Sequence, residues 1–305
     1  MQNQVVPITQ SALDIQQQTK ELISASIAPN TEKAYKHALA GLHAFLNGSQ
    51  LNDGHLATYI THLHTEGKSP STISQVVAAV KWTLKQSPAS TELPITNATL
   101  AGIRREGKER GRGQVEGLVW NDVERVCITA ELDKTKAGYR DSALIRLMSD
   151  CLLRVSEVVA VNCGHLKAKT LHIPTSKTDV EGKGESLYVT DSTREIIETY
   201  RELAEISSGA LFRYIRRGDH VQTSRIHSHS ARRIIKKRAK AVGIDNFISG
   251  HSLRVGTAVS LAQAGASVVD MQVAGRWKSA QMPAHYAKAE LAERGAIARY
   301  KDGKR

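Results

Sequence analysis

Cysteine is scarce in this sequence: Cys127, Cys151 and Cys163 are the only three in 305 residues. They are odd in number, none has C-x-x-C spacing, and no cluster of histidine and cysteine suggests a zinc site. We therefore expect free thiols in a reducing compartment, not a disulfide framework. The first residues also lack the basic and apolar regions of a secretory signal, so we predict a cytoplasmic location.

The sequence also has no long apolar run and no motif for a nucleotide or a metal. No run of about 18 apolar residues occurs, so we expect no transmembrane helix. There is neither a G-x-x-x-x-G-K-S/T loop nor a cluster of carboxylates. His227 and His229 are close enough in sequence to share a zinc ion, but no further ligands lie near them. We expect no cofactor, no metal, no membrane partner and no small-molecule substrate.

Acidic residues are outnumbered: Asp and Glu total 30 against 42 Lys and Arg, which gives a net charge of +12. Such an excess favours an anionic partner, either nucleic acid or a membrane surface. A basic protein whose charge serves only solubility is the alternative, and net charge alone does not exclude it. A protein that meets nucleic acid is the leading class, since nothing in the sequence spans a membrane.

The length of 305 residues suggests about two domains. Residues 1–28 are polar and rich in glutamine, and we expect a flexible lead-in there. Apolar residues with helical spacing then predict helices near residues 31–46, 56–64 and 73–84. We therefore expect a small all-helical domain over residues 29–102.

A basic segment, IRREGKERGRGQVEG, follows at residues 103–117. Its glycines predict a flexible linker, and its cations are suited to lie along a phosphate backbone. The candidate DNA contacts in this segment are Arg104, Arg105, Lys108, Arg110 and Arg112. A solvated run of charge between two domains is the alternative.

From residue 118 to residue 305 the pattern predicts a second domain with helices and a small β-sheet. One long helix is expected over residues 138–161. Short stretches at residues 169–176 and 185–191, rich in alternating or β-branched residues, flank a polar turn and predict a β-hairpin. Further helices are expected over residues 193–206, 230–242, 251–264 and 268–273. The predicted fold class is therefore mainly α with a small β-sheet.

Polar residues in these elements are candidates for chemistry. Arg154 stands among apolar residues, where a guanidinium is costly to bury unless it is paired, and Glu157 follows one helical turn later. His251 and Arg254 lie close together at a helix N-terminus, an end that suits a phosphate. Lys177 is in the hairpin turn, from where its amine can reach a groove and release a proton. Alone, each has a structural alternative: an Arg–Glu pair, a capping histidine or a surface lysine.

The order of these residues is more specific than any one of them. LLRVSE, TSKTD, SGHSLRVG and AGRW are followed by Tyr286, nine residues after Trp277. In these motifs the sequence resembles the tyrosine recombinase (phage integrase) family, over both domains. The resemblance implies an all-helical, SAM-like core-binding domain at residues 29–102 and an α+β catalytic domain at residues 118–305. One departure is Arg276, where the family has the second glycine of a G-G-W stretch.

The resemblance implies a site-specific DNA recombinase. Such an enzyme cleaves and rejoins strands through a 3′-phosphotyrosine intermediate and a Holliday junction, without metal or ATP. Tyr286 would be the nucleophile, because a phenol can attack a phosphate and later leave again. Arg154 and Arg254 would stabilise the charge on the phosphoryl oxygens as bidentate donors.

Further residues take roles in the site by the same resemblance. His251 would accept or relay the phenolic proton, and Lys177 would protonate the departing 5′-oxygen. Trp277 would donate its indole N–H to the phosphate. Glu157 would hold the geometry of the site without touching the DNA.

The partner implied by the resemblance is a double-stranded recombination site with inverted repeats. A homotetramer would act on two such sites, and the protein would be monomeric or weakly associated off DNA. The segment from about Lys288 would dock into a neighbouring protomer. Additional DNA contacts are expected at Arg232, Arg233, Lys236, Lys237 and Arg276. The first four place like charges at i, i+4 spacing, which repel unless an anion lies across them.

Two other functions stay open at this point. A type IB topoisomerase shares the chemistry, but it relaxes supercoils as a monomer without a defined site. A catalytically silent DNA-binding protein is the second alternative, although such a protein would have no need for the full set of reactive side chains.

Overall fold

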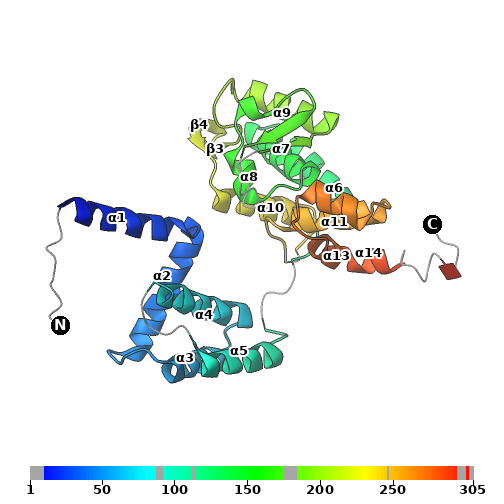
Figure 1. Cartoon of the computed structure of the whole chain (residues 1–305). Helices are drawn as coiled ribbons and strands as arrows, with labels where there is room; N and C mark the ends of the chain where they lie inside the picture. The colour runs from blue at the N-terminus through cyan, green and yellow to red at the C-terminus, as the bar shows by residue number, and fades with distance from the viewer. Residues whose placement is uncertain are drawn as a thin grey trace, which may run out of the picture. The chain divides into compact units, whose positions relative to one another are not determined.

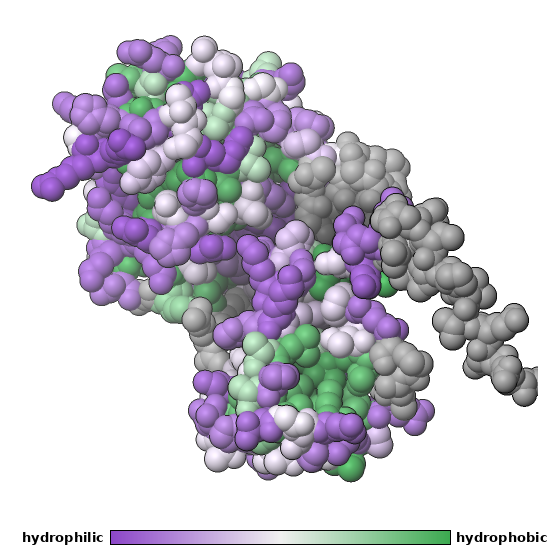
Figure 2. Space-filling view, turned by 90° about the vertical axis from the view of Figure 1, so that its left-hand side faces the viewer, coloured by the Kyte–Doolittle hydropathy of each residue, from purple (hydrophilic) through white to green (hydrophobic). Residues whose placement is uncertain are grey.

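The computed structural model describes residues 10–86, 92–110, 115–174, 184–245, 247–293 and 300–301. The chain forms two compact units, Met1–Gly113 and Gln114–Arg305, and both consist mainly of helices (Figure 1). No helix in the described ranges is long and apolar enough to cross a membrane. Hydrophilic side chains predominate on the face seen in Figure 2, with hydrophobic ones in smaller patches between them.

The N-terminal unit is helical, as predicted. Its helices are α1 (Gln10–Ala25), α2 (Pro29–Leu46), α3 (Asp53–Thr65), α4 (Pro70–Leu84) and α5 (Pro94–Glu106). Proline begins α2, α4 and α5, at a position where its missing N–H costs no hydrogen bond. Leu56, Ile60, Ile73 and Val80 lie in the shared apolar core of this unit.

Two boundaries of the N-terminal unit differ from the prediction. α1 occupies most of the segment expected to be a flexible lead-in, since it contains many good helix formers and neither glycine nor proline. α5 continues to Glu106, into the expected linker, because Ile103 is buried in the core. Arg104 and Arg105 therefore lie on a helix, while Arg112 falls outside the described residues.

The C-terminal unit combines helices with two short hairpins. Its helices are α6 (Trp120–Glu131), α7 (Lys136–Asp150), α8 (Val155–Ala160), η1 (Cys163–His165), α9 (Asp191–Leu203), α10 (Ser228–Ala241), α11 (Ser252–Gln263), α12 (Val268–Gly275), α13 (Gln281–Tyr286) and α14 (Lys288–Glu293). α7 packs against α6, α9 and α11, and every residue from Arg140 to Ser149 is buried. A helix without an exposed face is expected where neighbours cover it on all sides.

The predicted hairpin strands are confirmed. β1 (Thr170–Ile173) pairs antiparallel with β2 (Glu185–Tyr188), with Thr170 opposite Tyr188. The turn that carries Lys177 lies outside the described residues. A second antiparallel pair, β3 (Arg213–Arg216) and β4 (His220–Arg225), was not predicted, because its many charged and polar residues obscure the alternation typical of strands.

The single helix predicted over residues 138–161 is in fact two helices. α7 ends at Asp150 and α8 begins at Val155. Leu152, in the turn between them, is buried and adopts the left-handed region with φ of 45°. A buried apolar turn continues the hydrophobic pattern of the helices, so periodicity does not reveal it. Arg154 is consequently the N-cap of α8 and not a residue inside a helix.

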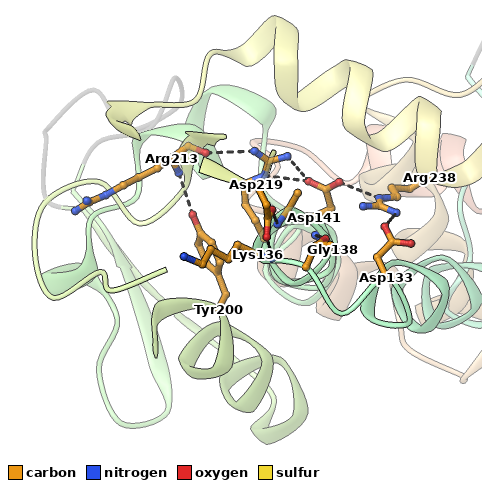
Figure 3. A network of polar contacts seen from close by, with 11 residues as sticks. Asp133, Lys136, Gly138, Asp141, Tyr200, Arg213, Asp219 and Arg238 are labelled. Carbon is orange, nitrogen blue, oxygen red and sulfur yellow. Dashed lines mark hydrogen bonds and ion pairs between the residues drawn. The ribbon is translucent and has the colours of Figure 1, made fainter. Parts of the chain in front are cut away.

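The turn between β3 and β4 is attached to the start of α7 (Figure 3). The carboxylate of Asp219 accepts hydrogen bonds from the N–H groups of Lys136 and Ala137, at 2.7 and 2.8 Å. These N–H groups have no partner within the helix, and a negative charge is favourable at this end. The hairpin is thereby fixed against the central helix.

Asp141 joins α7 to α10 through buried ion pairs (Figure 3). Its carboxylate lies 2.6 Å from Arg140 Nη2 and 2.8 Å from Arg238 Nε, and all three residues are less than 10% exposed. Arg238 also pairs with Asp133 at 2.5 Å. This network sets the rotation of α10, so that Arg232, Arg233, Lys236 and Lys237 are exposed on its outer side.

Asp141→Ala should destabilise the C-terminal unit by about 3–5 kcal/mol, because buried guanidinium groups would lose their shared carboxylate. Urea unfolding followed by circular dichroism measures this cost. The control is Asp245→Ala, whose side chain is 77% exposed and 3.8 Å from Lys240, and which should cost less than about 1 kcal/mol. Equal costs for the two variants would contradict the role given to Asp141.

Candidate active site

The predicted reactive residues of the C-terminal unit that the structure describes lie at or near the ends of helices. Arg154 is the N-cap of α8, His251 is the N-cap of α11, and Arg254 lies in the first turn of α11. Trp277 follows the end of α12, and Tyr286 is the last residue of α13. Helix ends leave backbone groups and side chains free to face a common point, which the middle of a helix does not.

The phenol of Tyr286 is hydrogen-bonded to the imidazole of His251. The oxygen lies 2.8 Å from His251 Nε2, and the two rings meet edge to face with centroids 5.5 Å apart. Ala287, the next residue, is completely buried against Ala262 and Met271. The phenol is therefore held in place by the packing of the residue that follows it.

Burial favours a neutral histidine and a neutral phenol at pH 7, and the nearby positive charges reinforce this effect only for the histidine. Partial burial, followed by the positive charges of Arg254 and Arg154, lowers the pKa of His251 below its usual value. Burial raises the pKa of Tyr286, while the same two arginines act in the opposite direction. A neutral His251 has a free ring nitrogen, so it is able to accept the phenolic proton.

Arg254 is buried with almost no exposed surface, at 1%. Its guanidinium donates hydrogen bonds to the carbonyl of Leu152 and, at 2.8 Å, to the carbonyl of Gly275. The ring of Trp277 lies beneath it, 4.6 Å from Cζ to the ring centroid. Burial and the nearby charges of Arg154 and Arg276 lower the pKa of Arg254 to about 10, so the group still carries its charge at pH 7.

Within the described residues, Arg254 donates hydrogen bonds only to backbone carbonyl groups, and it stacks on an aromatic ring. A carboxylate partner would neutralise it, whereas carbonyl groups orient it and leave its charge uncompensated. A buried cation in this state has a strong electrostatic preference for an anion placed next to it.

Glu157 connects two of the site's arginines. Its carboxylate accepts hydrogen bonds from Arg154 N and Nη1 at 2.9 and 2.8 Å, and from Arg276 Nη2 at 2.8 Å. Burial alone would raise the pKa of Glu157, but the charge of Arg276 and the hydrogen bonds from both arginines hold it below its usual value. Glu157 is therefore ionised and fixes the side chain of Arg154, which is 25% exposed.

The turn after α12 requires a glycine at position 275. A Cβ atom at Gly275 would come within 1.8 Å of the Trp277 ring, which folds back over it. Trp277 N donates to Gln272 O at 3.1 Å and closes the turn. This close approach places the indole beside Tyr286, with ring centroids 6.0 Å apart.

Other predicted site residues lie outside the described residues or belong to the other unit. Lys177 and Arg112 fall outside the described residues. Arg104, Arg105, Lys108 and Arg110 belong to the N-terminal unit, where Arg104 donates to Ser74 and Arg110 to the carbonyl of His64.

The α10 cations lie close to the cluster on one side. The side chain of Arg232 packs beside Gly250, since a Cβ atom there would lie 3.4 Å from Arg232 Cγ, and Gly250 precedes His251. Arg232, Arg233, Lys236 and Lys237 are exposed and form no ion pair within the described part of the chain. These cations thus extend the positive charge of the cluster along the exposed side of α10.

Arg276 does not fit its predicted role as a DNA contact. Its side chain is 4% exposed, and it pairs with Glu157 at 2.8 Å and with Glu185 at 3.5 Å. The side chain points into the protein because the backbone at Arg276 is left-handed, with φ of 54°. We did not predict the pairing of Arg276 with Glu157 and Glu185, nor the hydrogen bond from Arg254 to the carbonyl of Leu152. No pattern in the sequence marks these contacts.

No group of three or more His, Cys, Asp or Glu residues that could bind a metal occurs among the residues described. The charged groups of the cluster are guanidinium cations, which do not bind metal ions. Its chemistry is that of a phenol, a neutral imidazole and guanidinium groups, which together favour an anion beside them.

Comparisons with known proteins agree with this chemistry. Residues 120–293 match the model of the phage integrase family, and residues 15–86 match the model of the phage integrase N-terminal SAM-like domain. An integrase/recombinase xerD homolog of Selenomonas ruminantium is 28% identical over 292 residues, covering 88% of this chain and 84% of that protein.

Trp277 and the tail ERGAIARYKDG predicted that, within the family, the chain is most similar to Cre. Recombinase cre of Escherichia phage P1 is among the relatives, 22% identical over 264 residues, which cover 79% of this chain and 77% of cre. The xerD homolog shares more of its sequence with this chain than cre does.

Solved structures share the fold at lower identity. A XerH site-specific recombinase bound to a palindromic difH substrate has a TM-score of 0.67 and 16% identity, covering 89% of this chain and 80% of that one. A lambda integrase tetramer bound to a Holliday junction has a TM-score of 0.61 and 14% identity, covering 90% of this chain and 76% of that one.

The charge environment of His251 is directly measurable. In a pH titration by NMR, its pKa should lie below about 6.5, and Arg154→Gln should raise it because one nearby positive charge is removed. Arg125→Gln is the control, since Arg125 is exposed and pairs with Asp122 at 3.0 Å. A pKa of His251 at or above its usual value, or no response to Arg154→Gln, would show that the assigned electrostatics are wrong.

Proposed function

This chain belongs to the phage integrase family of tyrosine recombinases, and from that premise we propose that it is a site-specific DNA recombinase. It cleaves and rejoins strands through a 3′-phosphotyrosine intermediate and a Holliday junction. The observation that carries the proposal is the hydrogen bond of 2.8 Å between Tyr286 and His251, next to the uncompensated charge of Arg254. A phenol with a proton acceptor beside a phosphate-binding cation is equipped for phosphoryl transfer.

Cleavage begins with attack of the Tyr286 oxygen on the scissile phosphorus. The O–P bond to tyrosine forms as the bond from phosphorus to the 5′-oxygen breaks, and the phenolic proton passes to His251 Nε2. The 5′-oxygen leaves with a proton from Lys177, a role that rests on the family resemblance. Rejoining reverses these steps when a 5′-hydroxyl of the other strand attacks the phosphotyrosine.

Arg154 and Arg254 stabilise the negative charge that develops on the phosphoryl oxygens. Arg254 is preorganised by two carbonyl groups, and Arg154 is held by Glu157 through Nη1, which leaves its other guanidinium edge for a phosphate. Trp277 covers Arg254 and donates its indole N–H to the phosphate. The covalent bond conserves the energy of the phosphodiester, so we expect that neither a metal ion nor ATP is consumed.

Cations of both units hold the DNA. Arg232 extends the site along α10, with Arg233, Lys236 and Lys237 beyond it. Arg104, Arg105, Lys108, Arg110 and Arg112 would track the phosphate backbone from the other unit. The DNA is a double-stranded recombination site with inverted repeats, in the cytoplasm, on a nucleoid, plasmid or phage genome.

A homotetramer on two sites completes the reaction, since strand exchange needs two cleaved duplexes side by side. The segment after Lys288 docks into a neighbouring protomer. A partly apolar cavity of about 370 Å³, lined by Trp120, Leu152, Tyr188 and Leu261 among others, supports this by offering a place for side chains of a neighbour.

The covalent intermediate is the first test. On nicked DNA that carries a candidate site, the protein should form an adduct that survives a denaturing gel, and Tyr286→Phe should abolish it because the attacking oxygen is gone. Tyr214→Phe, at a tyrosine of β3 that is 46% exposed and outside the cluster, should form the adduct normally. An adduct that persists in Tyr286→Phe would contradict the assignment of the nucleophile.

Assembly on two sites separates a recombinase from a type IB topoisomerase. Removing residues 294–305 should leave adduct formation on one site intact and reduce paired-site complexes at least about tenfold in a native gel, because the docking segment is lost. The full chain on DNA without the site is the control and should neither pair duplexes nor relax a plasmid. Efficient relaxation of such a plasmid would favour the topoisomerase.

A further inference from the structure

Arg276 occupies a backbone position that suits glycine. It ends α12 with φ of 54°, in the left-handed region that a residue with a Cβ atom adopts at a cost. Glycine adopts this conformation without that cost, so the backbone itself does not call for arginine. The side chain must therefore contribute an interaction that glycine lacks.

The side chain of Arg276 is buried and paired with two carboxylates from different elements. Nη2 donates to Glu157 Oε2 at 2.8 Å, and Nε lies 3.5 Å from Glu185 Oε2. Nε and Nη1 are buried and form no hydrogen bond within the described residues. Burying a cation in this way is costly unless nearby carboxylates compensate its charge, as Glu157 and Glu185 do here.

These contacts connect three segments of the site. Glu157 belongs to α8 and holds both the backbone and the side chain of Arg154. Glu185 is the first residue of β2, directly after the segment that contains Lys177. Arg276 itself lies between Gly275, whose carbonyl accepts a hydrogen bond from Arg254, and Trp277.

We propose that Arg276 is a positioning residue for strand cleavage: it holds Glu157 in place and ties α8, β2 and the Trp277 turn into one unit. Without this cation, Glu157 is freed on one side and Arg154 loses its fixed orientation toward the phosphate. Arg276 touches neither the DNA nor the reacting atoms. The inference rests on the recombinase function proposed above.

The variant that tests this is Arg276→Gly, which removes the charge and suits the left-handed backbone, so the fold should persist. Single-turnover cleavage of a nicked substrate should slow at least about tenfold, as is usual for the loss of a residue that supports a site's geometry. The melting temperature should fall, because Glu157 loses one of its buried partners, so cleavage is compared at a temperature at which circular dichroism shows both proteins folded. There the affinity for DNA should stay close to that of the parent. Arg276→Lys should recover part of the rate, since an ammonium group can pair with Glu157 but lacks the planar fork.

The control for glycine at a left-handed position is Lys134→Gly. Lys134 has φ of 51°, is exposed, and lies in the turn between α6 and α7. Its replacement should leave the cleavage rate unchanged. Slowing by the same factor in Lys134→Gly would overturn the inference, because backbone flexibility alone would then explain the result.

Two further readouts separate positioning from other roles. If Arg276 acts through Glu157, the double variant with Glu157→Gln should cleave no more slowly than Glu157→Gln alone, whereas multiplying defects would overturn the inference. The dependence of DNA affinity on salt should be the same in Arg276→Gly and the parent. A slope reduced by about one would identify Arg276 as a phosphate contact and would also overturn it.

The test distinguishes its own failure from failure of the proposed function. Absence of any Tyr286-dependent adduct in the parent protein would contradict the recombinase function. A normal adduct in the parent, together with an equal cleavage rate in Arg276→Gly, would contradict only the role of Arg276.

Discussion

The arrangement of the active site depends on one buried carboxylate, that of Glu157. It closes the N-terminus of α8, fixes the guanidinium of Arg154 and pairs with Arg276. A carboxylate is stable in such a place only when cations and N–H groups surround it, and each of those cations is in turn stable only beside the carboxylate. The parts are therefore interdependent, and a phosphate-binding arginine keeps a defined direction before any DNA arrives.

In the proposed mechanism, the same charges couple DNA binding to proton transfer. Arg254 is oriented by carbonyl groups and stays uncompensated, so the site attracts a phosphate. The charges of Arg254 and Arg154 also contribute to the lowered pKa of His251, which keeps the imidazole neutral and able to take the phenolic proton. A bound phosphate would offset these charges and raise the basicity of His251 as the phenol needs a base. Phosphate binding and proton transfer would thus depend on the same two arginine charges.

Much of the fold follows from the local sequence pattern, and the exceptions have identifiable physical causes. Helical spacing located α2, α3 and α4 because each has a clear apolar side. It missed the break after α7, where the buried Leu152 continues the apolar pattern through a turn. It also missed β3 and β4, whose position depends on Asp219 reaching the start of α7, a contact between residues more than 80 apart in sequence.

The sequence by itself determined the chemical groups and their order along the chain, because Tyr286, His251, Arg254 and Arg154 stand in motifs whose spacing is legible without coordinates. Only the tertiary structure decided which of them touch and which way they point. It turned Arg276 inward to Glu157, although a basic residue beside Trp277 suggested a DNA contact. The physical reason is that the direction of a side chain depends on the backbone conformation of its turn and on carboxylates brought near by distant segments. Neither is encoded in the neighbouring residues.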